Sequence, residues 1–364
     1  MQIDFHHGTV YVIARYAGFG HREAAVVAYC SQYVDDATNS GIIHFTNGAM
    51  YQRTSSAHKT LDYRNFRKLA NRHVWIPFHF LPGNGGQRAG ENPDGTFIDK
   101  LICRPDSPVT HDMLRECIRQ RDNLHGLHRL GIAMHVYADT WSHQGFAGVS
   151  HQVNNIAALD RQGRPDPELQ GRLKRFFGNI FNDATSSFVG GTLPLGHGAA
   201  LSHPDRPYLK WSYRDHQGQL VKRDNPAQFS AAAHAMCKAM QRFRIGDADA
   251  RTPGLPNEAR DKINHLLQTL TAPDGDSRHR QWLARIKEGY FDFPPVTLDY
   301  RPKGVKSWKY EALQTRKAKD RQKDRFPYHP SFLGSDWKIF HDALLAHRYS
   351  VIRKILPRYG ICAA

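Results

Sequence analysis

Three residues of one segment, His135, Asp139 and His143, follow one another at intervals of four positions. At about 100° per residue, positions i, i+4 and i+8 of an α-helix stay within an arc of about 80°. A helix through this segment therefore presents two imidazoles and a carboxylate on one face. His125 and His128 fall in the same arc and are expected as alternate ligands or as residues that orient ligands. Zinc accepts both ligand types, so the segment predicts a metal site.

The neighbours of this trio favour a buried helix. Met134, Val136, Ala138 and Trp141 are interleaved with the polar residues. Burying imidazoles and a carboxylate without partners is costly, and one divalent metal ion satisfies all of them together. The alternative is a solvent-exposed polar face, which the apolar neighbours weigh against.

A second cluster opens the chain, where Asp4, His6 and His7 stand at the entrance to an apolar helix. Adjacent residues of a helix point in different directions. One of the two histidines is therefore expected to bind metal, with Asp4 as an alternate ligand. The alternative is a mobile polar terminus.

A third cluster is formed by Asp35 and Asp36 at the end of an apolar helix. The helix dipole disfavours negative charge there, so a nearby cation would explain the placement. His44 and His58 follow and are candidates to complete a site with one of the two aspartates. Ordinary polarity at a helix end is the alternative.

A fourth cluster, His197, His203 and Asp205, lies in a segment flanked by glycine and proline. It is the weakest of the four, because loop polarity explains it equally well. His203 is expected as an alternate ligand beside the other two.

The elements that must position these residues are mainly helical. Periodicity and capping residues predict a mainly α fold, a multi-helix bundle with long loops and a basic C-terminal extension. Residues 1–210 are expected to form the metal-binding catalytic region, and residues 211–364 a basic helical region that either stands alone or packs into the same domain. Helices are predicted over residues 7–17, 21–38, 61–73, 110–144, 167–182, 226–244, 257–271, 279–289 and 335–356, with a short strand at 74–81 and irregular or loop segments at 39–60, 77–108 and 190–225.

Charge indicates the class of partner. Lysine and arginine outnumber aspartate and glutamate by 50 to 34, which gives a formal charge of +16. Such a field attracts phosphate-bearing partners, either nucleic acid or an anionic membrane surface. Residues 301–328 combine basic and aromatic side chains, which suits either partner. Lys303, Lys306 and position 310 are considered as phosphate contacts, but none of them is assigned, and a solvated basic loop is the alternative.

Two further features bound the compartment. The opening MQIDFHHGTV lacks the basic and apolar regions of a signal peptide, so a cytoplasmic location is expected, with leaderless export left open. The five cysteines are odd in number and include no CxxC pair, which predicts reduced thiols rather than disulfides or a thiolate zinc cluster.

This arrangement resembles the all-helical, zinc-dependent phospholipase C and single-strand nuclease superfamily. That group carries an H-x3-D-x5-H helix, which His135 and Asp139 match, with His143 at spacing x3 in place of x5. The opening segments HHGTVYVIARYAGF and SQYVDDATNSG also resemble an uncharacterised bacterial branch of such proteins. The resemblance implies a site of three zinc ions that cleaves phosphoester bonds.

The resemblance extends to the other clusters in chain order over residues 1–210. Asp35 or Asp36 matches an aspartate that ends an early helix, and His58 matches the histidine after it. His7 or His6 matches an N-terminal histidine. His197 and Asp205 match a late pair, at spacing x7 where the family has x3. The family also binds zinc through the amine and carbonyl of an N-terminal tryptophan. This chain begins with Met1, so Asp4 or the second histidine is expected to substitute, or the third metal to be absent.

The function expected on this basis is a zinc-dependent phosphoesterase that uses a metal-activated water on phospholipid or nucleic acid. Asp139 is the expected bridging ligand, and Asp35 or Asp36 the residue that binds metal or orients the water. One alternative is an HD-type phosphohydrolase built on the pairs His111–Asp112 or His341–Asp342. A second is a non-catalytic basic protein with a structural metal that binds nucleic acid or membrane. The sequence contains no GxSxG, HExxH or P-loop motif, and it leaves the oligomeric state undetermined.

Overall fold

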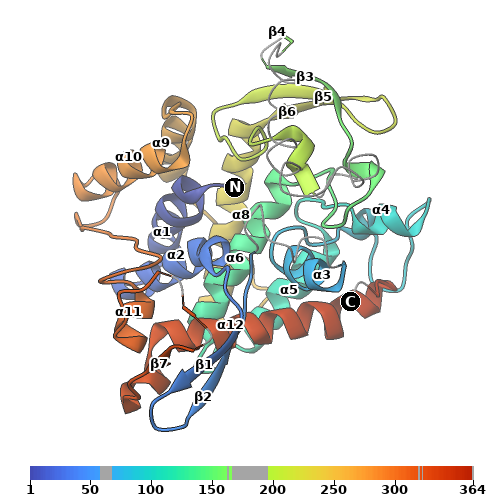
Figure 1. Cartoon of the computed structure of the whole chain (residues 1–364). Helices are drawn as coiled ribbons and strands as arrows, with labels where there is room; N and C mark the ends of the chain where they lie inside the picture. Colours follow the sequence, from blue (N-terminus) through green and yellow to red (C-terminus); the bar gives the residue numbers. More distant parts are fainter. Residues whose placement is uncertain (58–67, 162–163, 166–195, 319, 322, 363–364) are drawn as a thin grey trace.

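The fold is mainly α-helical, as predicted. The structure, a computed structural model, describes residues 1–57, 68–161, 164–165, 196–318, 320–321 and 323–362. Helix α6 (Gly126–Ser142) runs through its centre (Figure 1). It packs against α2 (His21–Asp36), α5 (Pro108–Arg119), α8 (Asn225–Ile245) and α12 (Asp336–Tyr349). Nearly every residue of α6 is buried, so this helix provides a rigid and enclosed base for any site built on it.

The composition of α6 explains its central place. Leu130, Ile132, Met134 and Val136 point in different directions around the helix and are all buried, which is the pattern of a helix enclosed on every side. Gly131 sets the distance to α2, because a Cβ atom there would lie 2.5 Å from Val27 O. A side chain at this position would push α2, and the aspartates at its end, away from α6.

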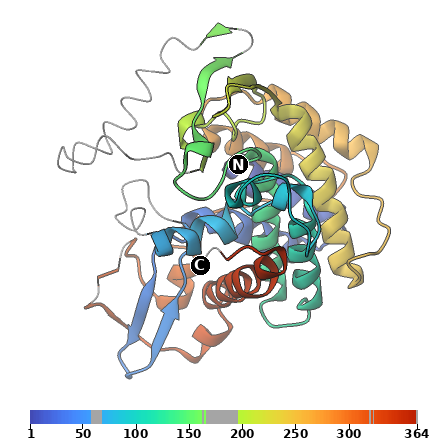
Figure 2. The same ribbon diagram turned by 90° about the vertical axis from the view of Figure 1, so that its right-hand side faces the viewer.

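The N-terminal segment is buried from its first residue. The π-helix η1 (Asp4–Thr9) continues directly into α1 (Val10–Tyr16), and all six residues of η1 are buried. The N-terminus lies in the interior in both views (Figures 1 and 2). Helix α10 (Gly275–Lys287) covers this segment, with the Trp282 side chain against Gly8. Residues on both sides of position 210 thus share one main hydrophobic core.

Two small sheets lie at opposite ends of the molecule (Figures 1 and 2). The first has the order β2–β1–β7, in which β1 (Gly41–Phe45) pairs antiparallel with β2 (Met50–Arg53) and parallel with β7 (Arg325–Phe326). The second has the order β4–β3–β5–β6 and is antiparallel throughout. Its strands are β3 (Ala157–Arg161), β4 (Arg164–Pro165), β5 (Lys210–Arg214) and β6 (Leu220–Asp224).

Shorter elements connect and cover this framework. None of the helices in the described ranges is long and apolar enough to cross a membrane. The five cysteines are unpaired, as predicted. The remaining elements are α3 (Lys68–Phe78), η3 (Asn84–Gly86), α4 (Phe97–Leu101), η4 (Gln152–Asn154), η5 (Gly196–Ala200), α9 (Asn257–Thr269), α11 (Trp308–Leu313), η6 (Pro330–Gly334), η7 (Ser350–Ile355) and η8 (Leu356–Tyr359).

Several predicted boundaries were wrong. The strand predicted at 74–81 is instead the end of α3, followed by a turn. The helix predicted at 110–144 is two helices, since the polar run from Gln120 to His125 breaks it. The segments read as irregular at 39–60 and 190–225 contain the hairpins β1–β2 and β5–β6. The helix predicted at 167–182 lies outside the described residues.

Of the three positions considered as phosphate contacts in the basic segment 301–328, position 310 carries no charge. Residue 310 is a tyrosine, so it cannot pair with phosphate as a lysine would. Tyr310 lies in α11, where its backbone nitrogen donates to the hydroxyl of the N-cap residue Ser307 at 3.1 Å. Lys303 is half-buried and Lys306 is exposed. Position 310 therefore adds an aromatic ring to this segment and no positive charge.

Candidate metal centre

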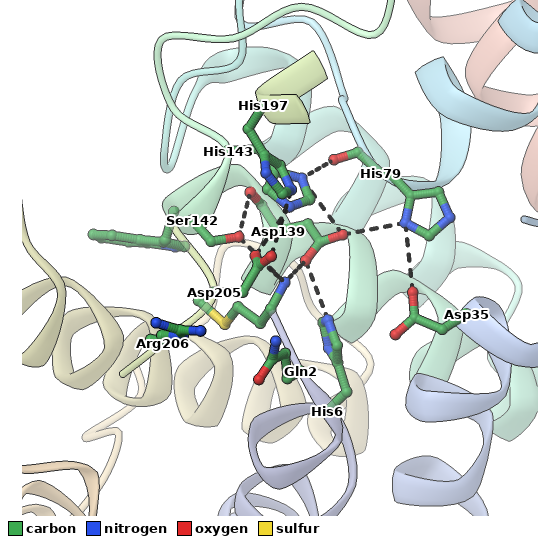
Figure 3. A network of polar contacts seen from close by, with 12 residues as sticks. Gln2, His6, Asp35, His79, Asp139, Ser142, His143, His197, Asp205 and Arg206 are labelled. Carbon is green, nitrogen blue, oxygen red and sulfur yellow. Dashed lines mark hydrogen bonds and ion pairs between the residues drawn. The ribbon is translucent and has the colours of Figure 1, made fainter. Parts of the chain in front are cut away.

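Eight metal-ligating side chains from distant parts of the chain meet beside α6. Their potential ligand atoms form three groups, and within each group these atoms lie no more than 4.8 Å apart. Most of these side chains point toward one another in Figure 3. The groups are His6, Asp35 and His135; His79, His135 and Asp139; and His143, His197 and Asp205.

Asp139 lies at the centre of this cluster and is 1 % exposed. Its Oδ1 atom is 3.1 Å from His6 Nε2 and 2.7 Å from the Met1 nitrogen. Its Oδ2 atom is 3.2 Å from His135 Nε2 and 3.3 Å from His79 Nδ1. Each carboxylate oxygen therefore faces a different set of nitrogen atoms, which is the arrangement required of a ligand that bridges two ions.

Backbone carbonyls fix the orientation of four of the imidazoles. Because a carbonyl oxygen can only accept a hydrogen bond, the ring nitrogen facing it must carry the proton. The opposite nitrogen of a neutral ring then presents its lone pair to the cluster, as second-sphere contacts do in metal sites. The four donated bonds are His79 Nε2 to Ser56 O at 2.9 Å, His135 Nδ1 to Ser31 O at 2.7 Å, His143 Nδ1 to His79 O at 2.7 Å and His197 Nδ1 to Leu201 O at 2.8 Å.

The protonation states of the cluster favour a bound cation. Burial lowers the pKa of His197 to about 4, so its ring is neutral near pH 7. Burial would raise the pKa of Asp205, but the Met1 amine, His197 and His143 together hold it well below its usual range. The lone pair of His197 Nε2 thus lies 3.5 Å from a carboxylate oxygen of Asp205. A metal ion between them would reconcile two electron-rich atoms this close.

His6 supports the same conclusion. Burial, then His135 and the Met1 amine, lower the pKa of His6 to about 3. Within the described part of the chain, its Nδ1 atom is buried without a hydrogen-bond partner. Either tautomer leaves one polar atom of this ring unsatisfied, an unfavourable state unless another group binds the ring.

The nitrogen of Met1 lies between two carboxylates of the cluster. It lies 2.7 Å from Asp139 Oδ1 and 3.2 Å from Asp205 Oδ1. Burial lowers the pKa of this amine, but Asp139, Asp205 and Asp35 raise it further, to about 11. The amine therefore bridges the two buried carboxylates in this structure. The expectation that Asp4 or the second histidine takes this place does not hold.

A buried ion pair anchors the segment that carries Met1 and His6. Asp4 Oδ2 accepts a hydrogen bond from Arg278 Nε at 2.6 Å, and both side chains are almost fully buried. Arg278 also donates to Gln2 Oε1 at 2.6 Å. Asp4 is thus fully engaged in holding η1 against α10, and it does not reach the cluster as a ligand.

A second buried arginine provides hydrogen bonds to backbone carbonyl oxygens at the C-terminal end of α6, where His143 is the C-cap residue. Arg223 donates to the carbonyl oxygens of Trp141, Ser142 and Gln144 at 3.0, 3.0 and 3.2 Å. Burial lowers its pKa to about 10, so it stays charged. Since the last carbonyls of a helix have no intrahelical donor, Arg223 supplies what this buried end lacks.

Two predicted ligands lie beside the cluster but turn away from it. His7 Nδ1 is 2.9 Å from His279 Nε2, because η1 points His7 away from its neighbour His6. Asp36 accepts a hydrogen bond from Tyr300 Oη at 2.7 Å, while Asp35 reaches His79 and His135. The structure therefore separates each of these adjacent pairs into one cluster residue and one outside it.

The remaining alternate ligands are also outside the cluster. His128 has the right direction on α6, but it lies about two turns before His135 and pairs with Asp336 at 2.8 Å. His125 precedes the helix as its N-cap residue. His44 lies on β1, and His203 packs against the ring of Trp211.

His79 was not predicted, and His58 lies outside the described residues. His79 follows α3, in a segment that was read as a strand, and it contacts both Asp35 and Asp139. His79 is one of the three side chains of the group it forms with His135 and Asp139. The one available signal was a histidine between two phenylalanines just after Pro77.

The two pairs expected for an HD-type enzyme do not form a site. His111 pairs on the surface with Asp106 at 2.8 Å. His341 is buried, and its Nδ1 atom contacts Thr54 O, whereas Asp342 pairs with Lys338. Neither pair belongs to a group of three or more metal-ligating side chains in the part of the chain that the structure describes.

Solvent reaches the cluster at two points. The Asp35 side chain is 35 % exposed, and those of His197 and Asp205 are 19 % and 12 % exposed. The side chains of His135 and Asp139 are almost fully buried. A small molecule can thus approach the cluster edge while its centre stays enclosed.

A comparison with protein families identifies one family, and its function is unknown. A model described as a family of unknown function (DUF6765) matches residues 1–355, and the chain belongs to this family. Searches of curated proteins and of solved structures gave no match.

Proposed function

We propose that this member of the DUF6765 family is a metal-dependent phosphoric ester hydrolase that holds two or three zinc ions. The observation that carries the proposal is the convergence of five imidazoles and three carboxylates, most of the imidazoles fixed by backbone carbonyls, on one partly open cluster. This is more ligand capacity than one four-coordinate structural ion uses.

The geometry suggests how the ligands divide. His135 Nε2 can bind only one ion, since its Nδ1 atom is committed to Ser31 O. One ion would be held by His135, His79, Asp35 and Oδ2 of Asp139. A second would be held by His6 and Oδ1 of Asp139, and the Met1 amine, whose pKa is raised to about 11, would have to lose its proton to join them. The third group would use His143, His197 and Asp205.

The ligand set favours zinc. Imidazole and carboxylate groups both bind zinc in tetrahedral sites. The three groups contain no thiolate, so these two ligand types are the ones available. The Cys103 thiol donates to Leu81 O, and burial, with a smaller effect of Asp139, raises its pKa well above its usual value. It therefore stays a protonated structural thiol.

The roles of the residues follow from exposure. Bound zinc ions would polarise a phosphoester and lower the pKa of a water molecule. Asp139, buried in the centre, would hold two ions at a fixed separation. Asp35, the most exposed member, would orient that water and accept its proton. Asp36 is excluded from this role by its hydrogen bond from Tyr300.

Matched variants of two histidines on α6 test the proposal. His135→Gln removes a ligand, while His128→Gln alters a histidine of the same helix outside the cluster. Zinc content is measured by elemental analysis, and activity on bis(p-nitrophenyl) phosphate with and without chelator. His135→Gln is expected to lose zinc and to reduce activity by at least about 100-fold, since outer contacts alone are worth about 10- to 100-fold.

His128→Gln is expected to retain both zinc and activity. A wild-type protein purified without chelator or a metal-affinity tag that holds no stoichiometric metal would refute the proposal. Zinc binding without hydrolysis of phospholipid, oligonucleotide or the chromogenic diester would instead support a structural metal in a basic binding protein.

A further inference from the structure

The outer face of the three-stranded sheet carries apolar side chains where water-facing residues are expected. Strand pairing places His44 opposite Met50 and Ile42 opposite Gln52, so these four residues share one face. Ile42 and Met50 are 54 % and 67 % exposed. The opposite face is buried, with Ile43 of β1 in the hydrophobic core.

The two aliphatic side chains form one patch. Met50 lies diagonally across the ladder from Ile42, at the spacing that lets long side chains touch. An antiparallel sheet with one buried face normally presents polar residues on the other. The sheet of β1, β2 and β7 projects from the helical body (Figures 1 and 2), so this patch can meet a flat surface.

Positive charge lies on the β7 side of the patch. The parallel partner β7 places Arg325 opposite His44, on the same outer face. Arg321 and Lys323 precede it and are also exposed. Residues 301–329 contain ten lysines and arginines against three acidic residues, so this segment supplies much of the chain's excess positive charge.

The nearby acidic residues are already neutralised. Asp320 is 4 % exposed and pairs with Lys309 and Arg53. Asp324 pairs with Lys317 at 2.8 Å. The face that remains combines aliphatic side chains with a basic rim, the composition by which proteins bind anionic bilayers.

We propose that this face, formed by Ile42, Met50 and the basic residues of β7 and its approach, docks onto an anionic lipid bilayer. Ile42 and Met50 enter the headgroup region, and Arg321, Lys323 and Arg325 contact the lipid phosphates. A nucleic acid would favour exposed aromatic side chains for base stacking, whereas the exposed apolar side chains here are aliphatic. The inference goes beyond the proposed hydrolase activity and does not depend on it.

Vesicle co-sedimentation tests the docking face. The full-length protein is mixed with phosphatidylcholine vesicles that contain or lack phosphatidylserine. Binding to the anionic vesicles is expected, and Ile42→Glu/Met50→Glu is expected to weaken it by roughly tenfold or more, because it removes both aliphatic groups and adds two negative charges. Ile42→Thr/Met50→Thr keeps residues that favour strands and should weaken binding without a charge change.

The control is Leu124→Glu/Ile245→Glu. It replaces two exposed aliphatic residues at another corner, which carries the acidic residues Asp122, Asp247 and Asp249, with the same change in net charge. This variant is expected to bind vesicles like the wild type.

The inference is overturned if the protein ignores anionic vesicles, or if both double glutamate variants weaken binding equally. It is also overturned if the Ile42/Met50 variants lose affinity for a single-stranded oligonucleotide while vesicle binding is unchanged. The measurement is repeated after chelator treatment. Vesicle binding should be retained after this treatment. If the untreated protein holds no zinc and hydrolyses no phosphoester but still binds anionic vesicles, the docking face is supported and the proposed function is rejected separately.

Discussion

The ion pair between Asp4 and Arg278 links the stability of the protein to the integrity of the candidate metal centre. The two side chains are 1 % and 0 % exposed, and the carboxylate receives guanidinium nitrogens at 2.6 and 3.2 Å. Asp4→Asn keeps the volume of the side chain but leaves the guanidinium buried without its counter-charge. We expect both a loss of stability and a loosening of the segment that carries Met1 and His6.

The size of the effect follows from the surroundings. Breaking one side of a buried ion pair costs about 3–5 kcal/mol. Gln2 and Ala272 still accept hydrogen bonds from Arg278, so the lower value, about 3 kcal/mol, is expected. For 364 residues, an unfolding entropy of about 2.1 cal/mol/K per residue converts this into a fall in Tm of about 4 °C.

Calorimetry and zinc analysis of two variants provide the test. The control, Asp292→Asn, breaks a surface pair in which Asp292 lies 2.6 Å from Lys262 and is 49 % exposed. Pairs of that kind are worth at most about 1 kcal/mol. Asp4→Asn should lower Tm more than the control and reduce the zinc content. Equal Tm values for the two variants, with full zinc occupancy in both, would refute the reasoning.

Three further predictions concern pH, the N-terminus and the end of α6. Burial lowers the pKa of His341 from 6.5 to about 3. The contribution of this ring to the free energy of unfolding is therefore complete above pH 6.5 and is lost as pH falls toward 3. Between pH 7.5 and 5.5, the free energy of unfolding measured by urea titration should fall about 1.4 kcal/mol more in the wild type than in His341→Asn; parallel curves would contradict this. A Gly-Ser extension ahead of Met1 should displace its nitrogen from Asp139, and elemental analysis should show a lower zinc content than in the chain without the extension. Arg223→Lys cannot reach all three carbonyls at the end of α6, so chelator competition should show zinc affinity weakened by about tenfold with Tm nearly unchanged; wild-type affinity would show that Arg223 has no positioning role.

Periodicity located the core of the candidate site because its spacing is local. His135, Asp139 and His143 lie on consecutive turns of α6, and all three enter the cluster. The same periodicity wrongly included His128, because it predicts the direction in which a side chain leaves the helix and not how far along the helix it lies. His128 points the right way and lies about two turns too far.

Residues positioned by tertiary contacts could not be found in this way. His79 follows a helix that contains Pro77, and β-branched and aromatic neighbours gave the segment the appearance of a strand. The position of Met1 depends on Arg278, far along the chain. The hairpin β1–β2 could have been predicted, because Asn47-Gly48 between two apolar runs is a strong turn signal.

The anchoring of η1 by α10 also bears on how the protein folds during synthesis. The first residues leave the ribosome long before Arg278 is made, so Asp4 and the buried histidines beside it lack their partner for most of translation. Contacts that span so much of the chain form slowly, and apolar residues of η1 and α1 remain available to wrong partners until then. Acquisition of metal at the proposed site is therefore expected to be a late event, completed only after α10 has left the ribosome and can pack against η1.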